Sequence, residues 1–183
     1  LRERPAPYAN PEQACVLRED FAKCWSKSTS LNSIANKLDN YTARPGWTGS
    51  RLFTSSNYLK MGQGSNMGEL TTPMLDTPLA DGLTIVLTLT PFGSSNKMTG
   101  SVSILLKSGN MQGSYNADGT QTMIFTTPSI EEAYQVQLSP STVCYISRFE
   151  VYDGVFSSEQ LGIDDDDEDS GKQSIPMAGG KRS

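Results

Sequence analysis

The amino-acid sequence predicts an all-β fold, an antiparallel β-sandwich of two sheets with one short helix. Apolar and polar residues alternate from Val16 onward, and clusters of Gly, Ser, Asn and Pro interrupt the alternation about every ten residues. The length of 183 residues suits one domain with a substantial core. We therefore expect one sandwich domain over residues 15–156, flanked by two segments of different composition.

The N-terminal segment is rich in proline. We expect residues 1–14 to be a linker or the end of a preceding domain, and a first strand at 16–22. Apolar residues then recur at helical spacing, which predicts a short helix over residues 31–40, covering an open end or edge of the sandwich. The apolar positions of this predicted helix are Leu31, Ile34, Ala35 and Leu38.

A glycine-rich stretch, GQGSNMGELTTPMLD at 62–76, is either a nucleotide-binding loop or a turn. A dinucleotide loop needs a strand before it and a helix after it. The residues after Gly68 include two threonines and a proline, which favour a strand. We therefore interpret the stretch as a hairpin turn between strands at 57–61 and 68–75, with the glycines supplying positive φ. A further strand is expected at 50–54.

The second half of the predicted sandwich has the most regular alternation. In LTIVLTLT at 83–90, leucine and isoleucine share one face and threonine occupies the other. Residues 102–106 and 134–138 alternate in the same way, and further strands are expected at 120–127 and 142–152. Each strand has one polar and one apolar face, as two stacked antiparallel sheets require.

The last segment, residues 157–183, is predicted to be an acidic tail rich in Gly and Ser. Its run DDDDED at 164–169 supplies six acids, and carboxylate oxygens are calcium ligands. The run lacks the glycine and the terminal glutamate of an EF-hand loop, and adjacent like charges repel each other. We therefore expect an extended, solvated tail.

Composition excludes several classes of function. The chain has no histidine, which excludes serine–histidine triads, cysteine–histidine pairs and histidine zinc sites. The net charge is −5 and there is no basic stripe, so we expect no nucleic-acid binding. The aliphatic and threonine run at 83–90 is far shorter than the roughly 20 residues that cross a bilayer. We therefore predict a chain that is not an enzyme and has no transmembrane segment of its own.

Three cysteines, Cys15, Cys24 and Cys144, form no CxxC motif. If residues 15–24 are extended, the two early sulfurs lie about 30 Å apart and cannot bond each other. A disulfide from one of them to Cys144 requires the first and last strands to be neighbours. The alternative is that all three are small buried side chains.

Aromatic residues crowd the first third of the chain. Sugar-binding proteins stack aromatic rings against the apolar faces of pyranose rings, so these residues are candidates for a glycan site. The candidate ligand-binding residues are Trp25, Trp47, Tyr58 and Tyr115. For the two tryptophans the alternative is a place in the core, because sandwich cores commonly contain a buried tryptophan.

Acidic residues on the first and last strands form a second candidate site. If these strands are neighbours, Glu19, Asp20 and Glu150 are placed to share a hard cation such as calcium, with Asp153 nearby. The alternative is ordinary surface charge.

The order of the motifs is more specific than any one of them. VLREDFAKCW, LDNYTARPGWTG, NYLKMGQGSNMGELTTPMLD and CYISRFEVYDG follow one another within residues 15–154. This series resembles the C-terminal jelly-roll modules of bacterial secreted and surface lipoproteins, similar to choice-of-anchor and galactose-binding-like sandwiches. The resemblance implies an extracellular or cell-surface, non-catalytic jelly roll that is joined to other domains of a longer protein and binds glycan or mediates adhesion.

The residues and the resemblance together predict a carbohydrate-binding or cell-surface recognition module whose partner is a glycan or cell-surface polysaccharide. One alternative is a structural or adhesion domain that binds another protein through a flat apolar surface or a strand edge. Another is a sandwich-type glycosidase, which needs two inward carboxylates about 5–10 Å apart across a groove.

Overall fold

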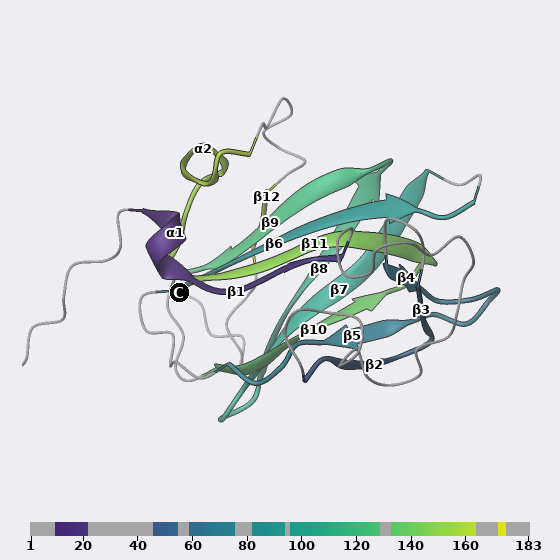
Figure 1. Cartoon of the computed structure of the whole chain (residues 1–183), viewed down its shortest axis with the longest axis horizontal. Coiled ribbons are helices and arrows are strands. Elements are labelled where there is room, and N and C mark those ends of the chain that lie inside the picture. Colours follow the sequence, from purple (N-terminus) through teal and green to yellow (C-terminus); the bar gives the residue numbers. More distant parts are fainter. Residues whose placement is uncertain are drawn as a thin grey trace, which may run out of the picture.

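The computed structural model describes residues 10–21, 46–54, 59–75, 82–93, 96–128, 133–163 and 172–174. These residues form two β-sheets that pack face to face (Figure 1). The predicted β-sandwich class is therefore confirmed. The predicted helix at 31–40 and the acidic run at 164–169 lie outside the described residues.

One sheet has seven strands in the order β12-β9-β6-β11-β4-β3, and β1 also pairs with β11. The pairing of β12 with β9 is parallel, whereas the strands around β11 pair antiparallel. The strands are β1 (Cys15–Asp20), β3 (Leu52–Thr54), β4 (Leu59–Met61), β6 (Leu83–Pro91), β9 (Gln121–Thr127), β11 (Cys144–Asp153) and β12 (Lys172–Ser174).

The other sheet has five strands in the order β2-β5-β10-β7-β8. They are β2 (Thr48–Ser50), β5 (Glu69–Thr71), β7 (Lys97–Leu106), β8 (Asn110–Asp118) and β10 (Ala133–Pro140). Two short helices complete the described elements, α1 (Pro11–Ala14) before β1 and α2 (Ser158–Leu161) after β11. None of the described helices is long and apolar enough to span a membrane.

Three strands lack a prediction of their own: β2, β8 and β12. The expected strand at 50–54 corresponds to β3 and shares only Ser50 with β2. In β8 the inward positions include Gly113 and Ala117, which carry little hydrophobic signal, although the strand alternates regularly between exposed and buried residues. Strand β12 has only three polar residues, Lys172–Ser174, and lies in the segment predicted to be a solvated tail. Its parallel pairing with Ile124–Thr126 of β9 adds it to the seven-stranded sheet.

The glycine-rich stretch is a turn, as predicted, but its flanking strands do not form a regular hairpin. Gln63 and Asn66 exchange backbone hydrogen bonds of 2.8 and 2.9 Å, and Gly62 and Gly64 have φ values of 102° and 63°. Beyond this turn the chain divides between the sheets, because β4 pairs with β11 and β3 whereas β5 pairs with β10 and β2. Just before the two strands diverge, Gly68 passes close to the backbone of Gly62. A Cβ at Gly68 would lie 2.6 Å from the Gly62 nitrogen.

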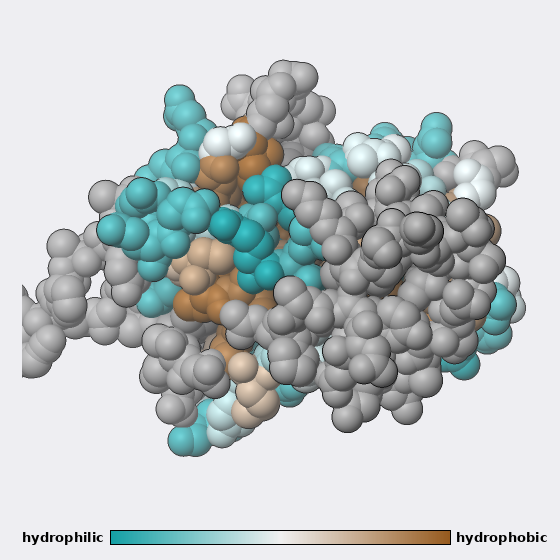
Figure 2. All heavy atoms as spheres, viewed as in Figure 1, coloured by the Kyte–Doolittle hydropathy of each residue, from teal (hydrophilic) through white to brown (hydrophobic). Residues whose placement is uncertain are grey.

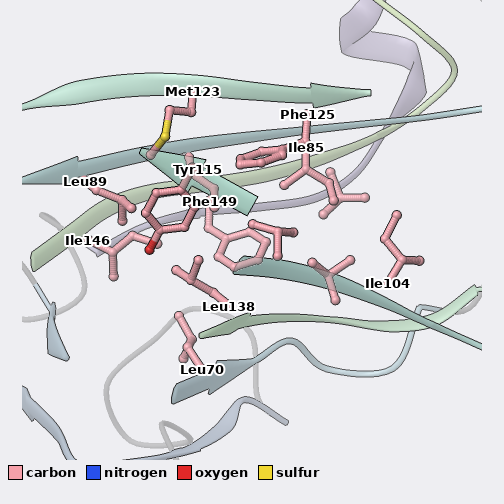
Figure 3. Packing of buried hydrophobic residues seen from close by; sticks show 14 of the residues in the cluster. Leu70, Ile85, Leu89, Ile104, Tyr115, Met123, Phe125, Leu138, Ile146 and Phe149 are labelled. Atoms are coloured by element: carbon pink, nitrogen blue, oxygen red, sulfur yellow. The ribbon is translucent and has the colours of Figure 1, made fainter. Parts of the chain in front are cut away.

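The core lies between the two sheets. Figure 3 shows Tyr115 of β8 surrounded by Leu89, Met123, Ile146 and Phe149 of the seven-stranded sheet. Trp47 precedes β2, has no exposed surface, and packs edge to face against Phe149 and Phe21 with ring centroids 5.4 and 5.2 Å away. These aromatic contacts join the two sheets.

A smaller apolar cluster covers part of the outer face of the seven-stranded sheet. It contains Ala14, Val86, Ile124, Tyr152 and Phe156. The hydroxyl of Thr84 fixes the segment after β11, because it donates to the carbonyl of Gly154 at 2.6 Å and accepts from the backbone of Phe156 at 3.0 Å. Figure 2 shows hydrophobic atoms at the surface beside α1 and α2, interrupted by polar ones.

The cysteines Cys15 and Cys144 are free thiols. Strands β1 and β11 are neighbours, but Cys15 lies opposite Tyr152, eight residues along β11 from Cys144. At about 3.3 Å per residue this separation excludes a disulfide between them. Burial raises the pKa of the Cys144 thiol to about 12. Cys24 lies outside the described residues, so a bridge that involves it stays a prediction.

We expect Gly100→Ala to lower the free energy of unfolding by about 1–3 kcal/mol, the usual cost of overpacking a core. Gly100 lies opposite Tyr115, and a Cβ there would overlap the Tyr115 hydroxyl and lie 2.7 Å from the Cα of Pro140. Urea unfolding measures the change. Ser101→Ala, a neighbouring change on the outer face of the same strand, is the control and should be near neutral. Equal unfolding midpoints for the two variants would contradict the packing described for Tyr115.

Candidate functional site

A group of aromatic and polar side chains lies on the outer face of the seven-stranded sheet. The register places Lys60 of β4 opposite both Phe53 of β3 and Tyr145 of β11, and Tyr145 also lies opposite Thr90 of β6. Lys60 is flanked in sequence by two core residues, as is Tyr145, so both side chains point away from the core. We call the group the Lys60 cluster; its members are Phe53, Lys60, Thr90, Phe92 and Tyr145.

The rings of the Lys60 cluster contact one another and the lysine. Phe92 and Tyr145 pack edge to face with centroids 5.7 Å apart. The Lys60 Nζ lies 4.0 Å from the centroid of Phe92 and 5.8 Å from that of Phe53, within the range of cation–π attraction. Phe92 is 39% exposed, one of the few large exposed hydrophobic side chains of the described residues. The cluster therefore presents aromatic surface beside a positive charge.

The Lys60 side chain is almost completely buried within this cluster. The residue is 5% exposed, and within the described part of the chain its ammonium contacts aromatic rings but forms no hydrogen bond or ion pair. Because this nitrogen has no hydrogen-bond partner among the described residues and yet is not fully enclosed, part of its surface is accessible to solvent. The stem is thus buried while the ammonium still reaches the surface, as long cationic side chains often do.

Hydroxyl groups border the cluster on the β6 side. Thr120 donates a hydrogen bond of 3.2 Å to the hydroxyl oxygen of Thr90, and Thr88 and Thr122 share one of 2.9 Å in the next row. Each hydroxyl can both donate and accept. These four threonines therefore form a polar margin on the β6 side of Tyr145.

Further along β11 the same face carries an ionic network centred on Glu150. Its carboxylate accepts hydrogen bonds from the Tyr152 hydroxyl and from Arg148, whose Nε and Nη2 lie 3.0 and 3.1 Å away. Arg18 of β1 lies 3.6 Å from Glu150 and also pairs with Glu12 at 3.1 Å. Burial, and next the hydrogen bond to Glu150, raises the pKa of Tyr152 to about 12. We assign this network a structural role because its charges satisfy one another.

The carboxylates predicted to bind calcium do not converge, although β1 and β11 are neighbours. Glu19 lies opposite Phe149 and shares the core-facing side of β1 with Leu17. Asp20 and Glu150 lie on the outer side, where two arginines hold Glu150. The described residues contain no group of three His, Cys, Asp or Glu side chains suited to a metal ion. Strand alternation therefore places Glu19 on the other face of the sheet from Asp20 and Glu150, and calcium binding by these residues stays a prediction.

The predicted glycan-binding aromatics are divided between the core and the segments outside the described residues. Trp47 is 0% and Tyr115 4% exposed, so neither ring offers a face to a ligand in this structure. Burial raises the pKa of the Tyr115 hydroxyl well above its usual range. Trp25 and Tyr58 lie outside the described residues, and their role stays a prediction. For Trp47, the structure has the core position that the sequence left as an alternative.

The outer face of the five-stranded sheet is polar but almost uncharged. Its cross-strand rows carry hydroxyl and carboxamide groups, for example where Gln137 donates to the hydroxyl of Thr71 at 3.1 Å. The exceptions in these strands are Leu105, Glu69 and an ion pair of 2.8 Å between Lys97 and Asp118 at one corner. The hydroxyl and amide residues are Thr48, Ser50, Thr71, Thr99, Ser101, Ser103, Asn110, Gln112, Ser114, Asn116, Gln135, Gln137 and Ser139.

A pocket of about 290 Å³ lies beside α2, away from the Lys60 cluster. Its wall combines apolar side chains of β9 and of the segment after β11 with a few hydroxyl and amide groups. The lining residues are Ile124, Thr126, Val155, Phe156, Ser157, Ser158 and Gln160. The hydroxyl of Ser157 caps α2 by accepting from the backbone of Gln160, so part of the polar lining is already used by the fold.

Comparison with known proteins gives distant likenesses only. No protein-family model and no curated protein matches the chain. One similar solved structure is the CBM1 module of BiXyn10A in its apo form, with a TM-score of 0.47 and 10% identity over 76% of this chain and 98% of that one. Another is the C-terminal CBM6 module of LamC, a marine laminarinase from Zobellia galactanivorans, with a TM-score of 0.42 and 13% identity over 74% of this chain and 98% of that one. A third is the enzymatically active domain of tailspike protein 4 of bacteriophage CBA120, with a TM-score of 0.35 and 10% identity over 75% of this chain and 20% of that one. Because these TM-scores are below 0.5, we base neither the fold nor the function on them.

We expect Tyr152→Phe to change how stability depends on alkaline pH. The pKa of Tyr152 is raised from 10.0 to about 12, so the folded chain retains the phenol proton better than the unfolded chain. The resulting stabilisation is complete below pH 10.0 and is lost as the pH rises towards about 12. The variant lacks this contribution, so its urea midpoint should fall less between these pH values than that of the wild type. Parallel curves would show that Tyr152 is not held as described.

Proposed function

We propose that this chain is a non-catalytic module that binds carbohydrate or recognises a cell surface, and that it acts outside the cell. The observation that carries the proposal is the exposed ring of Phe92 with Tyr145 beside it. Pyranose rings have apolar C–H faces that stack on aromatic surface, and their hydroxyls need polar partners close by. The hydroxyls of Thr90 and Thr120 next to the two rings supply such partners.

The polar face of the five-stranded sheet supports the same class of ligand. Side-chain hydroxyls and carboxamides both donate and accept hydrogen bonds, which matches the hydroxyl groups of a sugar. Rows such as Gln137, Ser103 and Gln112 lie side by side across three neighbouring strands. A glycan chain has complementary groups along its length, so this face offers a second region of contact.

Neither alternative has equal support among the described residues. A sandwich-type glycosidase needs two carboxylates that face one groove, whereas Glu19 faces the core and Glu150 is bound by arginines on the opposite side of the sheet. A protein-binding surface favours a contiguous apolar patch. The large exposed hydrophobic side chains Met74, Phe92 and Val155 come from three separate segments.

We expect Phe92→Ala to weaken glycan binding about tenfold, or about 1.4 kcal/mol, because the variant loses a stacking ring. Tyr145→Ala should weaken it in the same direction. Affinity electrophoresis against neutral and acidic polysaccharides identifies the ligand, and titration calorimetry measures the loss. Val155→Ala, which removes an exposed side chain that is 48% accessible beside α2, is the matched control and should bind like the wild type.

The proposal has two clear ways to fail. If the folded wild-type chain binds no polysaccharide of the panel, carbohydrate binding is excluded for that panel and protein partners become the better hypothesis. If a polysaccharide binds but Phe92→Ala and Val155→Ala bind it equally well, the Lys60 cluster is not the site. Thermal unfolding of each variant shows whether a loss of binding reflects a loss of structure.

A further inference from the structure

Lys60 differs in its surroundings from Arg18, Arg148 and Lys97. Arg18 and Arg148 pair with carboxylates on the same face of the sheet, and Lys97 pairs with Asp118 at 2.8 Å. The Lys60 ammonium instead lies over the ring of Phe92 at 4.0 Å, with no carboxylate among its contacts in the described residues. Among the residues that the structure describes, no carboxylate accompanies this cation.

A positive charge in this environment favours an incoming anion. Burying a cation removes water from it, and this cost is recovered only by an opposite charge, hydrogen bonds or aromatic faces. Two rings compensate part of the cost by cation–π attraction. The low polarity of Phe53 and Phe92 around the stem also strengthens any attraction that the ammonium exerts on a ligand.

The position of the ammonium is fixed before any ligand arrives. Strand β4 is hydrogen-bonded to β3 on one side and to β11 on the other. The Lys60 side chain lies against the rings of Phe53 and Phe92, and only 5% of the residue's surface is exposed. A lysine in solution loses side-chain entropy when it binds an anion. At this site the fold has already restricted the side chain, which favours binding.

We infer that the Lys60 cluster binds an acidic sugar, with a ring carboxylate on the ammonium of Lys60 and the sugar ring against Phe92 and Tyr145. This inference rests on the proposed carbohydrate binding and adds the class of sugar. A uronate carries its carboxylate directly on the pyranose ring, so one small residue presents an anion and an apolar face within a few ångströms. The cluster has the same combination, because its cation lies against the ring of Phe92.

Two threonines beside the cluster offer hydrogen-bonding partners for the hydroxyl groups of a sugar. Thr90 and Thr120 are hydrogen-bonded to each other at 3.2 Å on the far side of Tyr145 from Lys60. Each retains capacity for another hydrogen bond. A sugar whose carboxylate meets Lys60 therefore extends its hydroxyls towards these two residues. The arrangement distinguishes an acidic sugar from a simple carboxylate, which would use the lysine alone.

The test compares a uronate with its own neutral ester. Trimers of galacturonate and of mannuronate are titrated into the full chain by calorimetry, each as the free acid and as the methyl ester. The wild type should bind at least one free acid about tenfold more tightly than its ester. Lys60→Met keeps an apolar stem between the rings and should bring the two affinities within about twofold, with binding of the ester retained.

Lys97→Met is the matched control, because Lys97 is exposed and belongs to the other sheet. It should preserve the preference for the acid. A preference that survives in a folded Lys60→Met variant would overturn the inference. So would a wild type that does not distinguish acid from ester, a comparison that needs no variant and is independent of whether Lys60→Met folds.

Other outcomes separate this inference from the proposed function. If neutral polysaccharides or esters bind and the free acids bind no better, the chain is a carbohydrate-binding module and the acidic specificity is wrong. If neither form of either trimer binds and no polysaccharide binds, both proposals fail. Equal or tighter binding of a sulfated oligosaccharide at the same site would show an anion site that does not select a carboxylate, and would overturn the assignment to uronates.

Discussion

The pairing of strand β11 along both of its sides is the constraint on which the rest of the structure depends. One side matches β6 over nearly the whole strand, and the other side is shared end to end by β1 and β4. Phe149, near the middle of β11, packs edge to face against the ring of Trp47, which precedes β2 of the opposite sheet. One strand therefore connects the N-terminal strand, the centre of the seven-stranded sheet and the contact between the two sheets.

A β-bulge in β11 decides which side chains share the outer face. The register to β6 shifts between Ile146 and Arg148, so Cys144 and Ile146 face the core before the bulge and Phe149 and Val151 after it. Strict alternation would place Tyr145 and Glu150 on opposite faces, because they are an odd number of residues apart. The extra residue at the bulge restores them to one face, where Tyr145 joins the Lys60 cluster and Glu150 its own network.

The fold was predictable because its strongest signal is local. Period-two alternation in β6, β7 and β10 identifies each strand without knowledge of its neighbours, and the turn glycines at 62–68 mark where the chain reverses. The assignment of the two turn strands to different sheets was not predictable in the same way. It depends on which distant strand each one meets, and residues 59–71 contain no signal for that choice.

The site was less predictable because it depends on register between strands far apart in sequence. Phe53, Lys60, Thr90 and Tyr145 meet only because β3, β4, β11 and β6 are adjacent in this order. Alternation alone could have placed Lys60 outward, since Leu59 and Met61 both face the core. It could also have placed Glu19 inward with Leu17, and Tyr115 inward once β8 is recognised as a strand. Density of aromatic residues in the sequence was the weaker guide, because rings of the same kind fill the core.

The net charge of −5 does not oppose an anion site on this face, because electrostatic effects at a protein surface are local. At physiological ionic strength the screening length is about 8 Å, so charges beyond a few side chains contribute little. Around Glu150, the two arginines Arg18 and Arg148 face the carboxylates of Glu12 and Glu150 and nearly cancel them. The Lys60 ammonium has no such carboxylate among its contacts in the described residues. The distribution of charge on β11 and its neighbouring strands, rather than the total, therefore favours an acidic ligand beside Tyr145 at one end of β11 and a closed structural network around Glu150 further along it.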